Sequence, residues 1–390
     1  MATAVNQYGT RRRARPVKKN TQRSAGHEID HTFLILVIIM LIAGLVMLFS
    51  ASAPTGSTKF QNSYHFIAKQ SIFVVGGLVL MCIIARVDYR KYKHYSIPAM
   101  FFCILLLFLV LTPLGTELNG SQRWIWSFQP SELTKFVMAA YCAYMIELNV
   151  SDVTKVKQLF PYFFIIGIVA LLMMLETHLS GCIIIVAIAG VVMLVGGASA
   201  KLFIGGGLGL MSVGYLFIKT FMAERWSRVE NFGNPFLDMS GDGYQVAQGL
   251  YAIASGKIFG RGLGQSVQKT TYLPEPYNDF IFTIVCEELG FVGAVAIIIL
   301  FIAIIYHDLK IAYRAPDKFG MLTVIGIMAQ IAIQTVFNIA VTTASIPCTG
   351  ISLPFFSYGG TSIMILLMEM GFVLSVSKYG VKTNVETRQE

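Results

Sequence analysis

Residues 225–288 read RWSRVENFGNPFLDMSGDGYQVAQGLYAIASGKIFGRGLGQSVQKTTYLPEPYNDFIFTIVCEE. This long polar segment is rich in Gly, Gln, Arg, Asp and Glu, and it interrupts a chain that is otherwise dominated by apolar runs. Asp279 directly precedes the next apolar run, at the depth where water meets lipid. A bundle of membrane-spanning helices does not need so many polar groups in one segment. The pattern therefore indicates chemistry on a molecule that is itself anchored in the membrane.

The composition predicts an integral membrane protein. Hydrophobic residues make up 55% of the 390 residues and charged residues only 13%, and the mean hydropathy is +0.66. These values exclude an ordinary soluble domain. Because a span needs about 20 mostly apolar residues, we expect an all-α polytopic membrane protein with about ten transmembrane helices. The ten expected spans are residues 31–51, 65–86, 96–114, 131–148, 159–175, 181–198, 202–222, 280–305, 321–343 and 352–376.

Positive charge predicts how the chain is oriented. With ten spans both termini lie on one side of the membrane, and 20 of the 30 Lys and Arg residues fall on that side. The positive-inside rule makes this side the cytoplasm, so one large extracytoplasmic loop, about 223–279, lies between spans 7 and 8. The net charge of +9 follows mainly from this bias and requires no nucleic-acid partner.

The same pattern divides the chain into three parts. Residues 1–30 hold RRRARPVKK and predict a basic, disordered cytoplasmic tail that touches membrane lipids. Residues 31–377 form one membrane domain, and 378–390 form a short cytoplasmic tail. The first apolar run is too long for a cleaved signal peptide. The six cysteines have no metal-like spacing and are interpreted as small apolar residues.

Several spans carry polar side chains that lipid should exclude. Glu132 and Lys135 are three residues apart on one helix face. They either form a self-neutralised ion pair that fixes packing or line one wall of a polar cavity. In the ninth span, polar residues recur every four positions, which predicts interhelical hydrogen bonds or contacts with substrate. This stripe comprises Gln330, Gln334 and Asn338.

Three acids inside the later spans need partners. Glu287 and Glu288 lie about two turns into the eighth span, where Arg or Lys from the large loop, or Lys135, is expected to pair with them. Glu369 in the tenth span has no obvious partner in the sequence.

The external loops carry basic residues beside aromatic or glycine-rich segments. Arg123 beside Trp124 fits a phosphate clamp with an indole anchor at headgroup level. Residues 256–264 are rich in glycine but lack the Gly-Lys-Ser/Thr end of a phosphate loop, which argues against nucleotide binding. Backbone N–H groups near Arg261 and Lys269 suit a lipid-linked diphosphate. Gly359-Gly360 predicts a broken segment that lines a cavity.

Taken in order, these motifs resemble the SEDS family (shape, elongation, division and sporulation), the peptidoglycan polymerases that include RodA, FtsW and SpoVE. The resemblance spans nearly the whole membrane domain and is closer to the FtsW/SpoVE branch. The matching motifs are Arg123-Trp124, Gln129-Pro130-Ser131-Glu132 with Lys135, Gly243-Tyr244-Gln245 with Gln248, Gly262-Leu263-Gly264 with Ser266, Gln268-Lys269, Tyr272-Leu273-Pro274-Glu275, Asp279-Phe280-Ile281-Phe282, Glu287-Glu288-Leu289-Gly290 and the run Leu353–Gly360.

Three positions depart from the family pattern. Tyr277-Asn278 stand where the family often has His-Thr before the acid. His178 stands where the family has Asp in a Pro-Asp-x-Gly-Thr turn, and Thr349 stands at a position that is often Lys. The first departure leaves Asp279 in place but changes its neighbours.

The resemblance implies a glycosyltransferase that polymerises lipid II, the undecaprenyl-diphosphate-linked disaccharide peptide, at the outer face of the bacterial cytoplasmic membrane. The resemblance further implies that this enzyme acts in cell division or related wall synthesis. Asp279 is the candidate base for the acceptor hydroxyl, and attack opposite the leaving group inverts the anomeric centre. The alternative role for Asp279 is a helix N-cap on the eighth span.

The resemblance also implies the other site residues. Candidates for the diphosphate are Arg123, Arg225, Arg261 and Lys269. Further substrate-binding candidates are Trp124, Gln245, Gln248, Gln268, Glu275 and Ser357. The residues expected to hold the cavity together are Glu132, Lys135, Glu288, Gln334 and Asn338. No covalent cofactor and no metal ligand is assigned, although a divalent cation (Mg²⁺ or Mn²⁺) is compatible with the reaction.

Two other function classes stay open. A lipid II flippase also needs ten spans and a polar cavity, and it predicts translocation without chain growth. A non-catalytic scaffold for the divisome tolerates loss of Asp279. The expected partners of the polymerase are a class B penicillin-binding transpeptidase and other divisome or elongasome proteins.

Overall fold

A computed structural model describes residues 28–118, 121–148, 156–201 and 242–380, together with isolated positions between 205 and 236. Residues 1–27 of the expected tail 1–30, residues 381–390 and Arg225 lie outside the described residues. Most of the seventh expected span, 202–222, also lies outside them.

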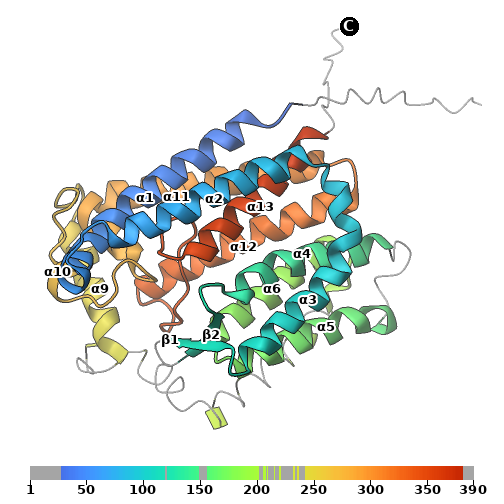
Figure 1. Ribbon diagram of the computed structural model, residues 1–390, viewed down its shortest axis with the longest axis horizontal. Helices are drawn as coiled ribbons and strands as arrows, with labels where there is room; N and C mark the ends of the chain where they lie inside the picture. Colours follow the sequence, from blue (N-terminus) through green and yellow to red (C-terminus); the bar gives the residue numbers. More distant parts are fainter. Residues whose placement is uncertain are drawn as a thin grey trace, which may run out of the picture.

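The described chain is mainly helical (Figure 1). In the N-terminal half, the helices are α1 (His31–Phe60), α2 (His65–Arg86), the short 3₁₀ helix η1 (Tyr89–Tyr95), α3 (Ser96–Val110), α4 (Pro130–Leu148), α5 (Val156–Leu175) and α6 (Leu179–Val195). In the C-terminal half, they are α9 (Asp242–Gly256), α10 (Gln268–Thr271), α11 (Ile281–Arg314), α12 (Lys318–Thr342) and α13 (Gly360–Lys378).

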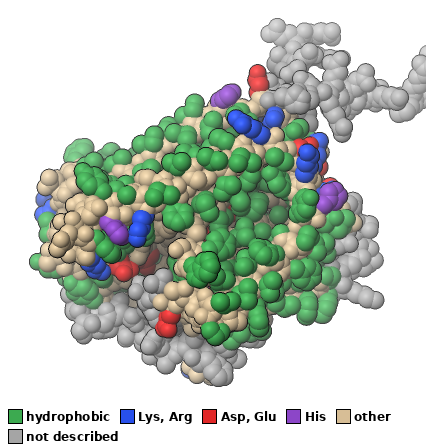
Figure 2. All heavy atoms as spheres, viewed as in Figure 1, with side chains coloured by type: hydrophobic (Ala, Val, Ile, Leu, Met, Phe, Trp, Pro, Cys, Tyr) green, Lys and Arg blue, Asp and Glu red, His purple; other side chains and the backbone are tan. Residues whose placement is uncertain are grey.

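Six helical segments among the described residues are long and apolar enough to cross a membrane. They are α1, α2, η1 with α3, α11, α12 and α13. Figure 2 shows apolar side chains over the middle of the visible face, with charges gathered toward its two ends. The apolar parts of α5 and α6 are shorter, and α4 contains Glu132, Lys135 and Glu147. The polytopic membrane class is thus confirmed, and the number of ten spans stays a prediction.

Helix α12 lies at the centre of the packing. It contacts α4 and α6 on one side and α9, α11 and α13 on others. Helices α3, α4, α5 and α6 form a group beside it, and α2 packs along α13 (Figure 1). A helix that is enclosed in this way holds its side chains in place more precisely than a loop does.

The all-α expectation missed a short β-hairpin. Strand β1 (Gly115–Leu118) pairs antiparallel with β2 (Ser121–Ile125), just before α4. The large loop also contains α9 and α10. The last span begins only at Gly360, and residues 352–359 form turns, since Pro354 and Gly359-Gly360 disfavour a helix.

Helix α11 is broken at Gly290, which has φ 68° and ψ −168°. The loop segment 257–262 lies against this break. The N–H of Arg261 donates to the carbonyl of Glu287 at 2.9 Å, and the N–H of Phe291 donates to the carbonyl of Lys257 at 3.0 Å. A Cβ on Gly290 would lie 2.2 Å from the nitrogen of Gly260. The backbones therefore approach so closely that only glycine fits.

We expect Gly260→Ala and Gly290→Ala each to lower the free energy of unfolding by more than about 2 kcal/mol, because positive φ and a backbone clash add together. Gly167→Ala in α5 is the matched control, since a Cβ there meets nothing within 4 Å. Thermal unfolding in detergent measures the difference. Equal unfolding temperatures for Gly290→Ala and Gly167→Ala would contradict the close approach.

Candidate active site

Asp279 lies in the turn that leads into α11 and is half-buried. The N-cap position of α11 is Phe280, and its side chain makes no capping hydrogen bond. The carboxylate of Asp279 faces the loop before α13: a Cβ on Gly350 would lie 3.6 Å from its Oδ2 atom. The cap position of the helix therefore falls to Phe280 and not to Asp279.

The backbone around Asp279 is fixed by three consecutive carbonyl groups. The carbonyl of Tyr277 accepts a hydrogen bond from the N–H of Tyr358 at 2.8 Å. The carbonyl of Asn278 accepts one from the hydroxyl of Ser357 at 2.7 Å. The carbonyl of Asp279 accepts one from the side-chain amide of Asn338 at 2.7 Å. We call these three bonds the carbonyl clamp.

The unusual pair Tyr277-Asn278 is packed into the protein. The Tyr277 ring is buried and packs against Phe66, with ring centroids 4.4 Å apart, and edge-on against Tyr358 at 6.0 Å. Burial raises the pKa of Tyr277 to about 12, and the charge of Glu275 contributes. The side-chain amide of Asn278 donates to Glu275 at 2.8 Å. These two residues thus hold the turn in place.

The other two departures from the family pattern lie close together. The hydroxyl of Ser180, in the first turn of α6, donates to the carbonyl of Thr349. His178 is the N-cap residue of α6 and is buried. The start of α6, next to His178, therefore contacts the loop at Thr349. The residue after Thr349 is Gly350, which faces Asp279.

Arg123 lies on β2 and reaches the same turn from the other side. Its guanidinium donates to the carbonyl of Thr177 at 2.7 Å. Glu176 beside it is only 2% exposed, and burial raises its pKa to about 8, partly offset by the charge of Arg123. Trp124 is half-buried opposite Thr116 in the hairpin.

The basic residues of the large loop form ion pairs with the two acids of α11. Lys269, which is 5% exposed, contacts Glu288 at 2.5 Å and the hydroxyl of Ser50 in α1 at 2.9 Å. Arg261 contacts Glu287 at 3.2 Å and keeps 43% of its side chain exposed. The loop thus supplies the partners for both acids, whereas Lys135 pairs elsewhere.

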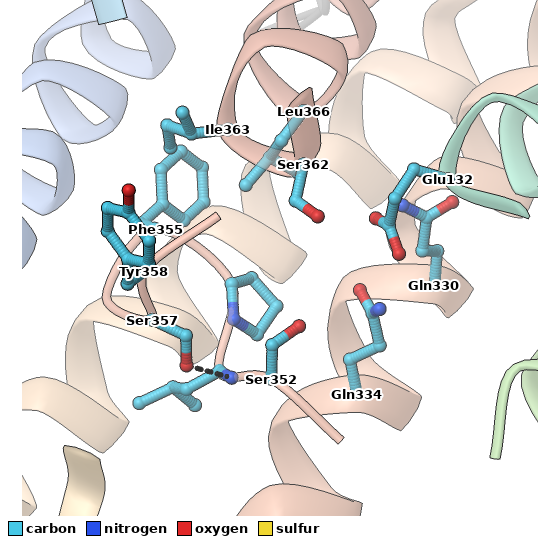
Figure 3. Close-up of a pocket in the computed structure, with 12 residues that line it drawn as sticks. Glu132, Gln330, Gln334, Ser352, Phe355, Ser357, Tyr358, Ser362, Ile363 and Leu366 are labelled. Atoms are coloured by element: carbon cyan, nitrogen blue, oxygen red, sulfur yellow. Dashed lines mark hydrogen bonds between the residues drawn. The ribbon is translucent and has the colours of Figure 1, made fainter. Parts of the chain in front are cut away.

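A small cavity of about 30 Å³, lined by both polar and apolar side chains, lies between α4, α12, α13 and the loop 352–358 (Figure 3). Glu132, Gln330 and Gln334 face Ser352 and Ser362 across it. The remaining lining residues are Leu353, Pro354, Phe355, Ser357, Tyr358, Ile363 and Leu366.

The acids beside the cavity have side-chain partners. Lys135 is 2% exposed and contacts Glu132 at 2.8 Å, so Glu132 both forms the ion pair and lines the cavity. The side-chain amide of Gln330 donates to both oxygens of Glu369, at 3.1 and 3.2 Å. This is the partner of Glu369 that the sequence did not reveal.

The remaining predicted residues lie on α9 and α10 of the large loop. Gln245 donates to the carbonyl of Pro274 at 3.4 Å, and Gln248 is buried in α9. Gln268 is the first residue of α10. In the part of the chain that the structure describes, no group of three or more His, Cys, Asp or Glu gathers as a metal site.

Three contributors to the site were not predicted from the sequence: Ser50, Gly350 and the backbone of Tyr358. Ser50 and Ser52 stand together at the end of an apolar run, and this polar pair was the one available signal. Nothing in the sequence indicated that Gly350 faces Asp279.

Comparison with known proteins gives a consistent result. A family model described as cell cycle protein, for FtsW, RodA and SpoVE, matches residues 30–382. Stage V sporulation protein E of Bacillus subtilis (strain 168) is 39% identical over 357 residues, which cover 90% of this chain and 97% of that protein. A probable peptidoglycan glycosyltransferase FtsW of Trichlorobacter lovleyi is 34% identical over 357 residues, covering 90% and 93%.

Solved structures share the fold. One chain, from a study described as the structural coordination of polymerization and crosslinking by a peptidoglycan synthase complex, has a TM-score of 0.74 and 25% identity, covering 90% of this chain and 97% of that one. The rod shape determining protein RodA of Thermus thermophilus has a TM-score of 0.66 and 24% identity, covering 90% and 96%. The second likeness concerns the fold alone.

We expect Lys269→Met to lower the free energy of unfolding by about 3–5 kcal/mol, because it leaves the carboxylate of Glu288 buried without its cation. The double variant Lys269→Met/Glu288→Met should recover most of this loss. Lys257→Met, at an exposed position of the same segment, is the control. A double variant less stable than Lys269→Met would contradict the pairing.

Stability should also depend on the protonation of Glu176. Its pKa is raised from 4.5 to about 8 on folding, so the folded state holds the proton more tightly than the unfolded state. The contribution of Glu176 to the free energy of unfolding is full below pH 4.5. It declines by a few kcal/mol in order of magnitude as the pH rises through 8. Unfolding temperatures of Glu176→Gln should lack this decline, and an unchanged pH profile would contradict the assignment.

Proposed function

The chain belongs to the FtsW/RodA/SpoVE family of cell cycle proteins, and from this we propose that it is a peptidoglycan glycosyltransferase that polymerises lipid II. Several relatives bear the name probable peptidoglycan glycosyltransferase FtsW, at 32–35% identity over about nine-tenths of this chain. The observation that carries the proposal is the half-buried Asp279, held by the carbonyl clamp beside a broken helix at the edge of an apolar span.

Asp279 acts as the general base in this proposal. Its carboxylate accepts the proton of the acceptor sugar hydroxyl while the hydroxyl oxygen attacks the anomeric carbon of the donor. The bond between that carbon and the diphosphate oxygen breaks, and the undecaprenyl diphosphate leaves with the electron pair. Attack from the face opposite the leaving group inverts the anomeric configuration, so an α-linked donor yields a β-linked strand.

Arg261 is the best placed of the described basic candidates to meet the diphosphate. Its side chain is 43% exposed while it remains bonded to Glu287. A guanidinium has enough N–H groups to bind a carboxylate on one edge and a phosphate on the other. Lys269 and Arg123, in contrast, point to internal partners, and their proposed role is to hold the large loop and the turn before α6 in place.

We also propose that the reaction takes place at the outer face of the cytoplasmic membrane and that both termini lie in the cytoplasm. The positive-inside distribution supports this orientation. We also propose a class B penicillin-binding transpeptidase as the partner, since one similar structure concerns a complex that coordinates polymerization and crosslinking. The divalent cation is assigned no step in the reaction.

The proposal predicts that Asp279→Asn lowers polymerisation of purified lipid II by at least about 10²-fold, because the amide cannot accept the proton. Gel analysis of glycan strands, with and without the transpeptidase, measures this. Thr335→Val, a near-isosteric change in α12, is the control. Near-normal strand growth by Asp279→Asn would refute the role of Asp279 as the base. If the wild type translocated lipid II without any strand growth, a flippase would be favoured. If it showed neither activity, a scaffold would be favoured.

A further inference from the structure

We propose that Asn338 is a positioning residue for Asp279: its side-chain amide joins the turn before α11 to the loop before α13 and thereby sets where the carboxylate lies. The proposal rests on the proposed function, in which Asp279 is the base. Asn338 itself touches no reacting atom and acts only through the backbone of the turn.

The contacts of Asn338 are unusual for a polar residue within an apolar helix. The side chain is fully buried, and its Nδ2 atom donates to the carbonyls of Asp279 and Ile351, each at 2.7 Å. Both partners accept but cannot donate, so the atom that faces them must be the amide nitrogen. Among the described residues the Oδ1 atom accepts no hydrogen bond. Both hydrogens of the amide are thus committed to joining two segments.

Those two segments determine the surroundings of the carboxylate. Ile351 directly follows Gly350, whose α-carbon faces Oδ2 of Asp279. One amide therefore fixes both sides of the gap between the carboxylate and the facing loop. A shift of about 1 Å in such a site can cost about 10²-fold in rate.

The helix that carries Asn338 suits this role. Helix α12 is in contact with α4, α6, α9, α11 and α13, so it cannot easily follow a movement of either loop. Thr342, one turn further on, donates its hydroxyl to the carbonyl of Asn338 at 2.9 Å and ties down the end of the helix. The anchor is rigid, and the two loops are held relative to it.

Two alternative roles for Asn338 predict different outcomes. If the residue contacted substrate, its loss would raise KM, but its committed amide hydrogens and full burial argue against this. If it only stabilised the fold, its loss would lower the unfolding temperature without a specific effect on the catalytic step. Positioning predicts a fall in kcat with little change in KM.

The test compares Asn338→Leu, Asn338→Asp and the control Thr335→Val in the full-length protein. Hydrogen–deuterium exchange follows the segments 277–285 and 351–358, and polymerisation of lipid II gives kcat and KM. Asn338→Leu, which keeps the shape but donates no hydrogen bond, should raise exchange in both segments and lower kcat by about 10²-fold, with KM within about twofold. Thr335→Val should leave the exchange of both segments, kcat and KM near the wild-type values.

Asn338→Asp keeps the size of the side chain and covers the case in which Asn338→Leu fails to fold. An ionised Asp donates no hydrogen bond, whereas a protonated one donates a single bond. Its kcat relative to the wild type should therefore rise as the pH falls. An Asn338→Asp variant with a wild-type kcat at all pH values would overturn the proposal.

Two further results would overturn it in different ways. Increased exchange with unchanged kcat in Asn338→Leu would make the clamp purely structural, and increased KM with unchanged kcat would make Asn338 a substrate contact. In both cases wild-type activity and its loss in Asp279→Asn would leave the proposed function standing. A wild-type protein that does not polymerise lipid II would refute the proposed function and the positioning role together.

Discussion

Three neighbouring backbone carbonyls, those of Tyr277, Asn278 and Asp279, must be hydrogen-bonded within the protein, and the rest of the site depends on how this is achieved. A buried carbonyl without a donor costs about 1–3 kcal/mol, and this turn carries the buried side chains of Tyr277 and Phe280. The donors come from α12 and from the loop before α13, which are distant in the sequence. Satisfying the turn therefore also brings those segments beside Asp279.

The large loop is held to the membrane helices by a second set of interactions. The cations Lys269 and Arg261 neutralise two acids that α11 buries, and Ser50 extends the contact to α1. The break at Gly290 lets the loop backbone approach close to α11. Such ion pairs add little net stability but strongly disfavour alternative positions of the loop. Helix α1, near one end of the chain, and the large loop are thus both held to α11.

The sequence was sufficient for the class of the protein, and the assignment of its chemistry to Asp279 stays a prediction. Apolar runs predicted the helices, because a bilayer requires about 20 such residues per span, and the position of Asp279 before a span was visible at once. The rule that buried charges need partners also predicted that loop cations would meet Glu287 and Glu288. The sequence could not show which way individual side chains point. Lys269 was expected to face a diphosphate but faces Glu288. Ser357 was expected to bind substrate but donates to a backbone carbonyl. Those orientations depend on long-range contacts, for which spacing along the chain gives no signal.

The role of Asp279 as the base depends on its distance from the acceptor sugar. A structure of the protein with a lipid II acceptor bound, determined in a lipid bilayer, measures this distance directly. We expect an acceptor hydroxyl about 2.6–3.2 Å from a carboxylate oxygen of Asp279, or joined to it through one water molecule. An acceptor hydroxyl bonded instead to another basic group, with Asp279 out of reach, would contradict that role.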